Sequence, residues 1–190
     1  MKKEDIITLP NANLRKRSKR VGLITPEVRK LITDMEAATL DWELSRKHEI
    51  TVGLAAVQVD KLLRIFILRD NTNQPNNTFL AFINPEITKY EGKIESEYEG
   101  CLSIQDVYGL VPRYSGVRIR AQNINGKVFT MKAKGDLARI MQHETDHTNG
   151  IVFIDHIKDS PEAFYILNDK GNLEQLDYKK DVKDSKVLWP

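Results

Sequence analysis

The feature of this sequence that most restricts its fold is the pentapeptide His-Glu-Thr-Asp-His at residues 143–147. Residues four apart share one face of an α-helix, so His143 and His147 can bind one metal ion if this segment is helical. In such a motif the intervening glutamate, Glu144, lies beside the metal and can act as a general base. The chain has only four histidines, so this spacing seldom arises by chance. The motif therefore predicts a metal-binding helix.

Residues around the motif agree with a helix from Asp136 to His147, followed by Gly150 as a stop signal. The apolar residues expected on one side of this helix are Leu137, Ile140 and Met141. A longer amphipathic helix is predicted from Val28 to about Lys47, because its apolar residues recur mostly at helical spacing. Thr25 as N-cap and Pro26 at the first helical position mark its start.

Several short runs between and after these helices are typical of strands. The predicted strands are Leu62–Leu68, Leu80–Ile83, Gly92–Glu97, Val117–Asn123 and Lys127–Lys132. Asn125-Gly126 separates the last two and predicts a tight hairpin. A second hairpin is expected from Ala163–Leu167 and Leu173–Leu176, around residues 169–171.

These elements predict an α+β fold, with antiparallel strands around a central metal-binding helix and another helix near the N-terminus. We expect a single domain over residues 1–190, with a core of about residues 5–158. Residues 159–190 are expected to form a C-terminal tail with a possible hairpin.

Composition excludes several classes of protein. Charged residues make up 29% of the chain and the net charge is +2, which argues neither for direct DNA binding nor for a membrane surface. No run approaches the roughly 20 apolar residues that span a bilayer, and no apolar segment follows the basic N-terminus as in a secretory signal. We therefore expect a cytoplasmic protein. The basic run Leu14–Val21 is interpreted as a solvated loop, with a transient nucleic-acid or ribosome contact as the alternative.

Two histidines do not complete a catalytic metal site, which usually has three protein ligands and one open position. In one class of zinc peptidases the third ligand lies six residues past the second histidine, where this chain has Phe153. His156 comes three residues too late, and Glu162 and Glu174 lie in or beside predicted turns. Cys101, the only cysteine, is the remaining candidate, and a thiolate with two imidazoles is a sound tetrahedral set.

With these residues in view, the chain resembles the peptide deformylases, three of whose motifs occur here in the family's order. The first, usually Gly-x-Gly-Leu-Ala-Ala-x-Gln, corresponds to TVGLAAVQ at residues 51–58. The second is EGCLS at residues 99–103, and the third is QHETDH at residues 142–147. The resemblance extends over roughly four fifths of the chain.

The resemblance implies an enzyme that removes the formyl group from the N-terminal methionine of nascent polypeptides. It implies Cys101, His143 and His147 as metal ligands and Glu144 as the general base. The oxyanion would be stabilised by the side-chain amide of Gln58 and the backbone N–H of Leu102. The ion expected by resemblance is Fe²⁺, although Zn²⁺, Ni²⁺ or Co²⁺ also suits this donor set and can occupy purified protein.

The same resemblance assigns the substrate contacts. Val52 and Gly53 are expected to pair with the substrate backbone like an added strand. Gly100 permits close approach of a backbone or substrate beside the metal. The methionine side chain needs an apolar pocket, for which Val52, Ile140 and the imidazole face of His143 are candidates.

Two further residues are implied to support the site. Glu99 resembles a family residue that pairs with an arginine, here Arg113, and we expect a structural role for this pair. Asp146 is expected either to orient a histidine or to be a solvated helix carboxylate.

The chain departs from the family pattern at a few positions. Thr51 replaces a glycine at the substrate cleft and Val57 replaces a Pro or Asn beside Gln58, which puts peptide preference and the aim of the glutamine in question. The two rival interpretations are a zincin-type metallopeptidase and a non-catalytic relative that only binds formyl-methionine peptides.

Overall fold

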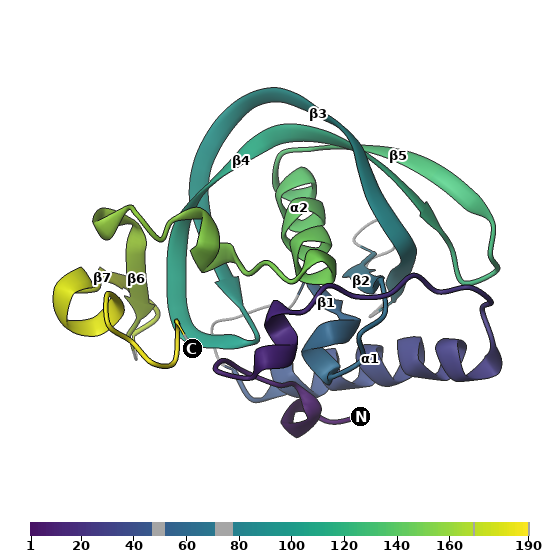
Figure 1. Ribbon diagram of the computed structural model, residues 1–190, viewed down its shortest axis with the longest axis horizontal. Coiled ribbons are helices and arrows are strands. Elements are labelled where there is room, and N and C mark those ends of the chain that lie inside the picture. The colour runs from purple at the N-terminus through teal and green to yellow at the C-terminus, as the bar shows by residue number, and fades with distance from the viewer. Residues whose placement is uncertain (47–51, 71–77, 169, 190) are drawn as a thin grey trace.

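The structure, a computed structural model, describes residues 1–46, 52–70, 78–168 and 170–189. Within these ranges the strands form one antiparallel seven-stranded sheet of order β1-β2-β3-β4-β6-β7, with β5 paired to β4 (Figure 1). The strands are β1 (Gly53–Ala55), β2 (Ile65–Arg69), β3 (Phe79–Cys101), β4 (Ile104–Gln122), β5 (Val128–Lys134), β6 (Phe164–Leu167) and β7 (Leu173–Gln175). The α-helices are α1 (Pro26–Leu44) and α2 (Asp136–Asn149). The predicted α+β fold, with antiparallel strands around a central helix, is confirmed.

The long hairpin of β3 and β4 arches over α2 (Figure 1). The sequence predicted two separate strands, Leu80–Ile83 and Gly92–Glu97, where the structure has the single strand β3. Register shifts between residues 83 and 86 and between residues 91 and 94 interrupt its pairing with β4. Pro85 and Gly92 lie within these irregularities, which bend the strand and conceal its continuity from a periodicity analysis.

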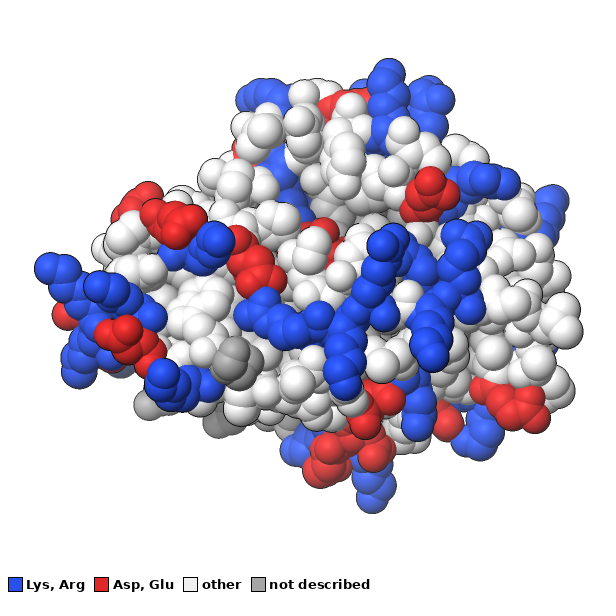
Figure 2. Space-filling view, in the orientation of Figure 1, with Lys and Arg blue, Asp and Glu red and all other residues white. Residues whose placement is uncertain are grey.

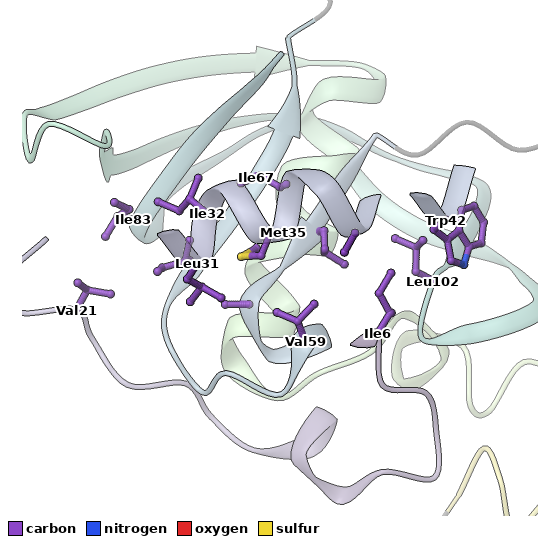
Figure 3. Packing of buried hydrophobic residues seen from close by; sticks show 14 residues of the cluster. Ile6, Val21, Leu31, Ile32, Met35, Trp42, Val59, Ile67, Ile83 and Leu102 are labelled. Carbon is purple, nitrogen blue, oxygen red and sulfur yellow. The ribbon is translucent and has the colours of Figure 1, made fainter. Parts of the chain in front are cut away.

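Helix α1 packs along one side of the sheet through the side chains of Leu31, Ile32 and Met35 (Figure 3). Thr25 and Pro26 occupy the predicted N-cap and first helical positions. The helix ends at Leu44, before the predicted end at Lys47, a residue outside the described ranges. Burial of this apolar face fixes α1 against the strands that carry the residues of the first motif.

Helix α2 is the predicted metal-binding helix and is largely buried although most of its residues are polar. Leu137, Ile140 and Met141 lie on one side of the helix as predicted, but this side is not uniformly buried: Met141 is fully buried, Ile140 half-buried and Leu137 41% exposed. The buried face runs instead through Ala138, Met141 and Thr145. The sheet also encloses polar residues of this helix, so hydrophobicity in the sequence does not identify the whole buried face.

The tail contains the predicted hairpin, formed by β6 and β7. Strand β6 also pairs with β4, so the hairpin extends the main sheet. Phe164, Val182 and Leu188 bury their side chains in a second hydrophobic cluster, together with Leu14 and Phe153 from earlier in the chain. Asp169, in the predicted turn, lies outside the described residues.

The backbone of the basic N-terminal segment is held by hydrogen bonds. The Ser18 N–H donates to Thr148 O at 3.0 Å, and the Lys19 N–H donates to Leu62 O at 2.9 Å. The side chains of Lys16, Arg17, Lys19 and Arg20 are exposed. Figure 2 shows Lys and Arg side chains gathered across the middle of one face. None of the helices in the described ranges is both long and apolar enough to cross a membrane.

Gly150 gives a test of how α2 is anchored to the N-terminal segment. Its φ is +78°, and a Cβ added there would lie 2.6 Å from the carbonyl oxygen of Arg15. Gly126 has the same φ, but its nearest atom would be a flexible side-chain carbon of Ile24 at 3.7 Å. We expect Gly126→Ala to lower the free energy of unfolding by about 1–2 kcal/mol, the cost of the left-handed conformation alone. Gly150→Ala should lower it by clearly more, because the added methyl group would also collide with the Arg15 carbonyl. Urea unfolding measures both, and equal losses would contradict the proposed close contact.

Candidate metal centre and active site

Three potential metal ligands converge at the middle of the fold. One ligand atom each from Cys101, His143 and His147 lies within 4.8 Å of the others. Cys101 is the last residue of β3, whereas the two histidines lie one turn apart on α2. Cys101 Sγ and His147 Nε2 are 3.3 Å apart. The hairpin and the helix, distant in sequence, thus bring together the three residues predicted as ligands.

The local environment fits a metal ion. A thiolate and two imidazoles form a tetrahedral donor set that leaves one position for water or substrate. Burial lowers the pKa of His147 well below its usual value, which keeps a ring nitrogen free of a proton and available as a ligand. His147 Nδ1 and Glu144 Oε2 are buried without a hydrogen-bond partner among the described residues. Buried polar atoms normally have partners, so the Glu144 oxygen points to a site that binds a polar ligand. His147 Nδ1 lies on the side of the ring away from Nε2, which faces Cys101.

A buried carboxylate orients one of the histidines. Glu99 Oε2 lies 3.0 Å from His143 Nδ1, and the Arg113 guanidinium donates to both oxygens of Glu99 at 2.9 and 3.0 Å. Arg139 Nη1 donates to the same carboxylate at 2.7 Å. Burial alone would raise the pKa of Glu99, but the hydrogen bonds from His143 and Arg113 hold it far below its usual value. A carboxylate only accepts, so His143 Nδ1 carries a proton and Nε2 is the atom that could bind a metal. Burial opposes the charged ring, but hydrogen bonds with Cys101 and Glu99 raise the pKa of His143 well above its usual value, so a metal ion would displace a proton from Nε2.

The expected pairing of Glu99 with Arg113 is thus present, but Glu99 also contacts a histidine directly. Asp146 instead forms a close ion pair with Arg113, and its Oδ2 lies 2.7 Å from His156 Nε2. Asp146 is therefore neither fully solvated nor a partner of His143 or His147. It orients His156 and supports Arg113 from the side opposite Glu99.

The alternative third ligands are used elsewhere. Phe153 stacks on the imidazole of His143, with ring centroids 6.2 Å apart. His156 contacts Asp146, and neither Glu162 nor Glu174 belongs to a metal-competent cluster within the described part of the chain. The structure thus offers no third ligand to the zincin interpretation among the residues it describes.

Gln58 is held so that its amide nitrogen faces the thiolate. Its Oε1 accepts from the Ala55 N–H at 2.8 Å, while its Nε2 donates to Ser103 Oγ at 3.2 Å and lies 3.5 Å from Cys101 Sγ. The side chain is 1% exposed. Val57, which replaces the usual Pro or Asn, is fully buried in a core cluster. The direction of the amide is therefore set by Ala55 and Ser103.

Glu144 lies in a setting suited to proton transfer. Burial raises the pKa of its carboxyl to about 7, against the opposing effect of nearby His143. A Cβ added at Gly53 would lie 2.8 Å from Glu144 Oε1, so the carboxylate packs directly against the backbone of β1. Only glycine permits this approach at position 53.

Cys101, His143, Gln58 and Glu144 line a cavity of about 360 Å³, whereas His147 is fully buried and does not line it. The residues of the sequence-predicted site along its wall are Val52, Gly53, Gln58, Gly100, Cys101, Leu102, Ile140, His143 and Glu144. Val52 is 38% exposed at the cavity. Ile140 and Leu102 add apolar surface within reach of the metal ligands. Thr51, whose effect on the cleft was in question, lies outside the described residues.

Sequence reasoning missed several residues of the site. Trp42, Tyr98, Tyr108 and Arg139 also line the cavity. Arg139 stands four residues before His143, on the same helical face, and this spacing could have revealed it. Ser103 lies within the second motif, but its contact with Gln58 depends on two segments that only the fold brings together.

A thiolate and a helical histidine pair, with a buried glutamate beside them, define a metal-dependent hydrolase. The sequence pattern of the polypeptide deformylase family matches residues 3–162. The chain belongs to this family of metal-dependent enzymes, which remove the N-formyl group from nascent peptides.

Individual relatives agree with this assignment. The peptide deformylase of Nitrobacter hamburgensis is 38% identical over 157 residues, covering 80% of this chain and 86% of the relative. A peptide deformylase of Synechococcus elongatus, solved in complex with actinonin, superposes with a TM-score of 0.71 at 34% identity, covering 80% of this chain and 76% of the other. A class I type b peptide deformylase of Acinetobacter baumannii, solved with bound Met-Ala-Ser, has a TM-score of 0.70 and 29% identity, with coverages of 80% and 96%.

The buried Glu99–Arg113 pair should contribute far more to stability than an exposed pair on the same hairpin. Replacing one partner of a buried ion pair costs about 3–5 kcal/mol, whereas exposed pairs contribute up to about 1 kcal/mol. We therefore expect Arg113→Met to lower the free energy of unfolding of the metal-free protein by about 3 kcal/mol. Lys93→Met, which removes the exposed Lys93–Glu95 pair, should change it by less than about 1 kcal/mol. Similar losses in both variants would refute the special role of the buried network.

Proposed function

We propose that this chain hydrolyses the formyl amide of N-formyl-methionyl peptides at a centre with Cys101, His143 and His147 as ligands of one divalent metal ion. The observation that carries the proposal is the convergence of these three ligand atoms, two of whose residues, Cys101 and His143, line one cavity together with Glu144. The products are formate and a peptide with a free N-terminal methionine.

The donor set supports a choice of metal. One soft thiolate and two imidazoles suit Fe²⁺, Zn²⁺, Co²⁺ or Ni²⁺, and we propose Fe²⁺ as the working ion on the family resemblance. When bound, the ion would polarise the formyl oxygen and lower the pKa of the attacking water.

Glu144 accepts the proton of the attacking water and then delivers it to the amine of the departing methionine. Its position against Gly53 keeps the carboxylate at the wall along which the substrate backbone would lie. The Nε2 of Gln58 and the backbone N–H of Leu102 donate to the oxyanion that develops from the formyl oxygen. Because Ala55 and Ser103 already fix the Gln58 amide, this donor needs little reorganisation during the reaction.

The remaining walls bind the substrate. Val52 and Gly53 offer backbone groups to an extended peptide. Gly100 lines the same cavity, and its missing side chain leaves room for the ring of Tyr108 beside Cys101. Val52, Ile140 and the ring of His143 receive the methionine side chain. The bound Met-Ala-Ser in the Acinetobacter relative supports a short peptide as the occupant of this cavity. A formyl carbon carries only hydrogen, so a site that closes around it excludes the larger acetyl group.

We propose that the substrates in the cell are formyl-methionyl chains still being synthesised. Because such chains are made in the cytoplasm, the proposed activity is cytoplasmic. The exposed Lys16, Arg17, Lys19 and Arg20 would support a transient contact with the ribosome through its phosphate groups.

Formate release from formyl-Met-Ala-Ser tests the reaction. Protein loaded anaerobically with Fe²⁺ should release formate, and Glu144→Gln should lower kcat by about 10²–10⁴ because a general base is removed without a change of shape. Acetyl-Met-Ala-Ser should give no acetate. Metal content is measured in parallel for the wild type and the variant. A wild-type protein with one metal ion per chain and no formate release would instead indicate a relative that only binds such peptides.

The oxyanion role of Gln58 predicts a loss of turnover without a loss of metal. Gln58→Leu should lower kcat by about 10²–10³, the usual effect of removing one oxyanion donor. The matched control is Gln105→Leu, which changes an exposed glutamine two residues past Ser103 and should retain wild-type turnover. Steady-state kinetics and metal analysis distinguish the outcomes. Full activity of Gln58→Leu would exclude it as an oxyanion donor.

A further inference from the structure

One end of the cavity has an aromatic wall that the proposed reaction does not require. Tyr98 and Tyr108 both line the cavity, and Tyr98 is 49% exposed. A Cβ added at Gly100 would lie 2.7 Å from the ring of Tyr108. The ring therefore lies over the residue next to the ligand Cys101, and the aromatic wall begins beside the proposed metal centre.

A third tyrosine, from the C-terminal tail, holds this wall in place. Tyr165 packs edge-on against Tyr98, with ring centroids 4.9 Å apart and an interplanar angle of 89°. Tyr165 lies on β6 and pairs directly with Tyr108 of β4. The hairpin of β6 and β7 adjoins β4 at one edge of the sheet (Figure 1). Residue 165 also lies beyond the family match, which ends at residue 162.

The backbone under these rings is fixed by three adjoining strands. Tyr98 lies opposite Leu110 in the β3–β4 ladder, and Tyr108 lies opposite Tyr165 in the β4–β6 ladder. Aromatic side chains on such a support lose little conformational freedom when a ligand binds, so much of their contact area contributes to affinity. A second tyrosine pair on the same hairpin, Tyr90 with Tyr114, has a similar ring distance of 5.1 Å but does not line the cavity.

The position of the wall matches a particular part of the substrate. Tyr98 precedes Cys101 by three residues on β3, a separation of at most about 10 Å at roughly 3.3 Å per residue, because a register shift between Glu99 and Cys101 interrupts the regular strand. An extended peptide whose formyl carbon lies at the metal centre spans about the same distance by its second or third residue.

We propose that Tyr98 and Tyr108 form a binding subsite for a large apolar or aromatic side chain at the second or third residue of the formyl-methionyl peptide, and that Tyr165 positions Tyr98. This inference rests on the proposed function and extends it to a preference within the nascent chain. Edge-to-face and stacked contacts between aromatic rings supply the selectivity.

The test compares kcat/KM for formyl-Met-Ala-Ser, formyl-Met-Phe-Ser, formyl-Met-Ala-Phe and formyl-Met-Ala-Asp with the Fe²⁺-loaded enzyme. We expect phenylalanine at one of the two positions to raise kcat/KM by about three- to tenfold, mainly through a lower KM. The aspartate peptide, which offers no aromatic ring to the tyrosines, should show no such gain over formyl-Met-Ala-Ser. Tyr98→Ala and Tyr165→Ala should each reduce the phenylalanine preference to less than twofold, whereas Tyr165→Phe, which keeps the ring, should retain it.

Tyr90→Ala is the matched control, because it removes a half-exposed tyrosine from the same strand and leaves the cavity wall intact. It should show the wild-type preference. Equal kcat/KM for all four peptides, or a preference that survives both Tyr98→Ala and Tyr165→Ala, would overturn the subsite. Failure to hydrolyse any of the peptides would instead contradict the proposed function, so the two failures are distinguishable.

Discussion

The carboxylate of Glu99 is the group on which the rest of the structure depends. It is buried in the centre of the fold and receives hydrogen bonds from Arg113 of β4 and Arg139 of α2, while it orients His143. These contacts join the hairpin to the helix at the point where the ligands meet. A buried carboxylate without such partners would be strongly destabilising, so the network supports both the fold and the geometry of the site.

The arrangement also explains how so polar a helix can lie inside a sheet. Gln142 of α2 exchanges hydrogen bonds with the backbone of Tyr114, accepting from its N–H at 3.2 Å and donating to its carbonyl at 2.9 Å. The helix thereby satisfies backbone groups of β4 as a neighbouring strand would. The bends in β3 and β4 let the sheet enclose α2, and the buried polar side chains that result are available for chemistry.

The C-terminal hairpin shows how a segment beyond the family match comes to support a residue of the cavity wall. Pairing of β6 with β4 extends the sheet and brings Tyr165 against Tyr98. The same segment buries Phe164 in a cluster shared with the core. One structural addition therefore contributes both to the core and to the support of a cavity residue, since β6, which anchors the hairpin, also carries the ring of Tyr165.

Much about this protein was determined by the sequence itself, because local spacing is sufficient to specify it. The His-x-x-x-His spacing predicted α2 and its metal-binding face, Thr25 and Pro26 marked the start of α1, and Asn125-Gly126 located a hairpin. The order of the three motifs indicated the family, and the motifs contain most of the predicted residues that line the cavity. The continuity of β3, the exposure of Leu137, the contact of Glu99 with His143 and the aromatic pair of Tyr98 and Tyr165 were decided only by the tertiary structure. Bulges erase strand periodicity, and contacts between residues 44 to 67 positions apart depend on how a bent sheet closes around a helix, which local sequence does not encode.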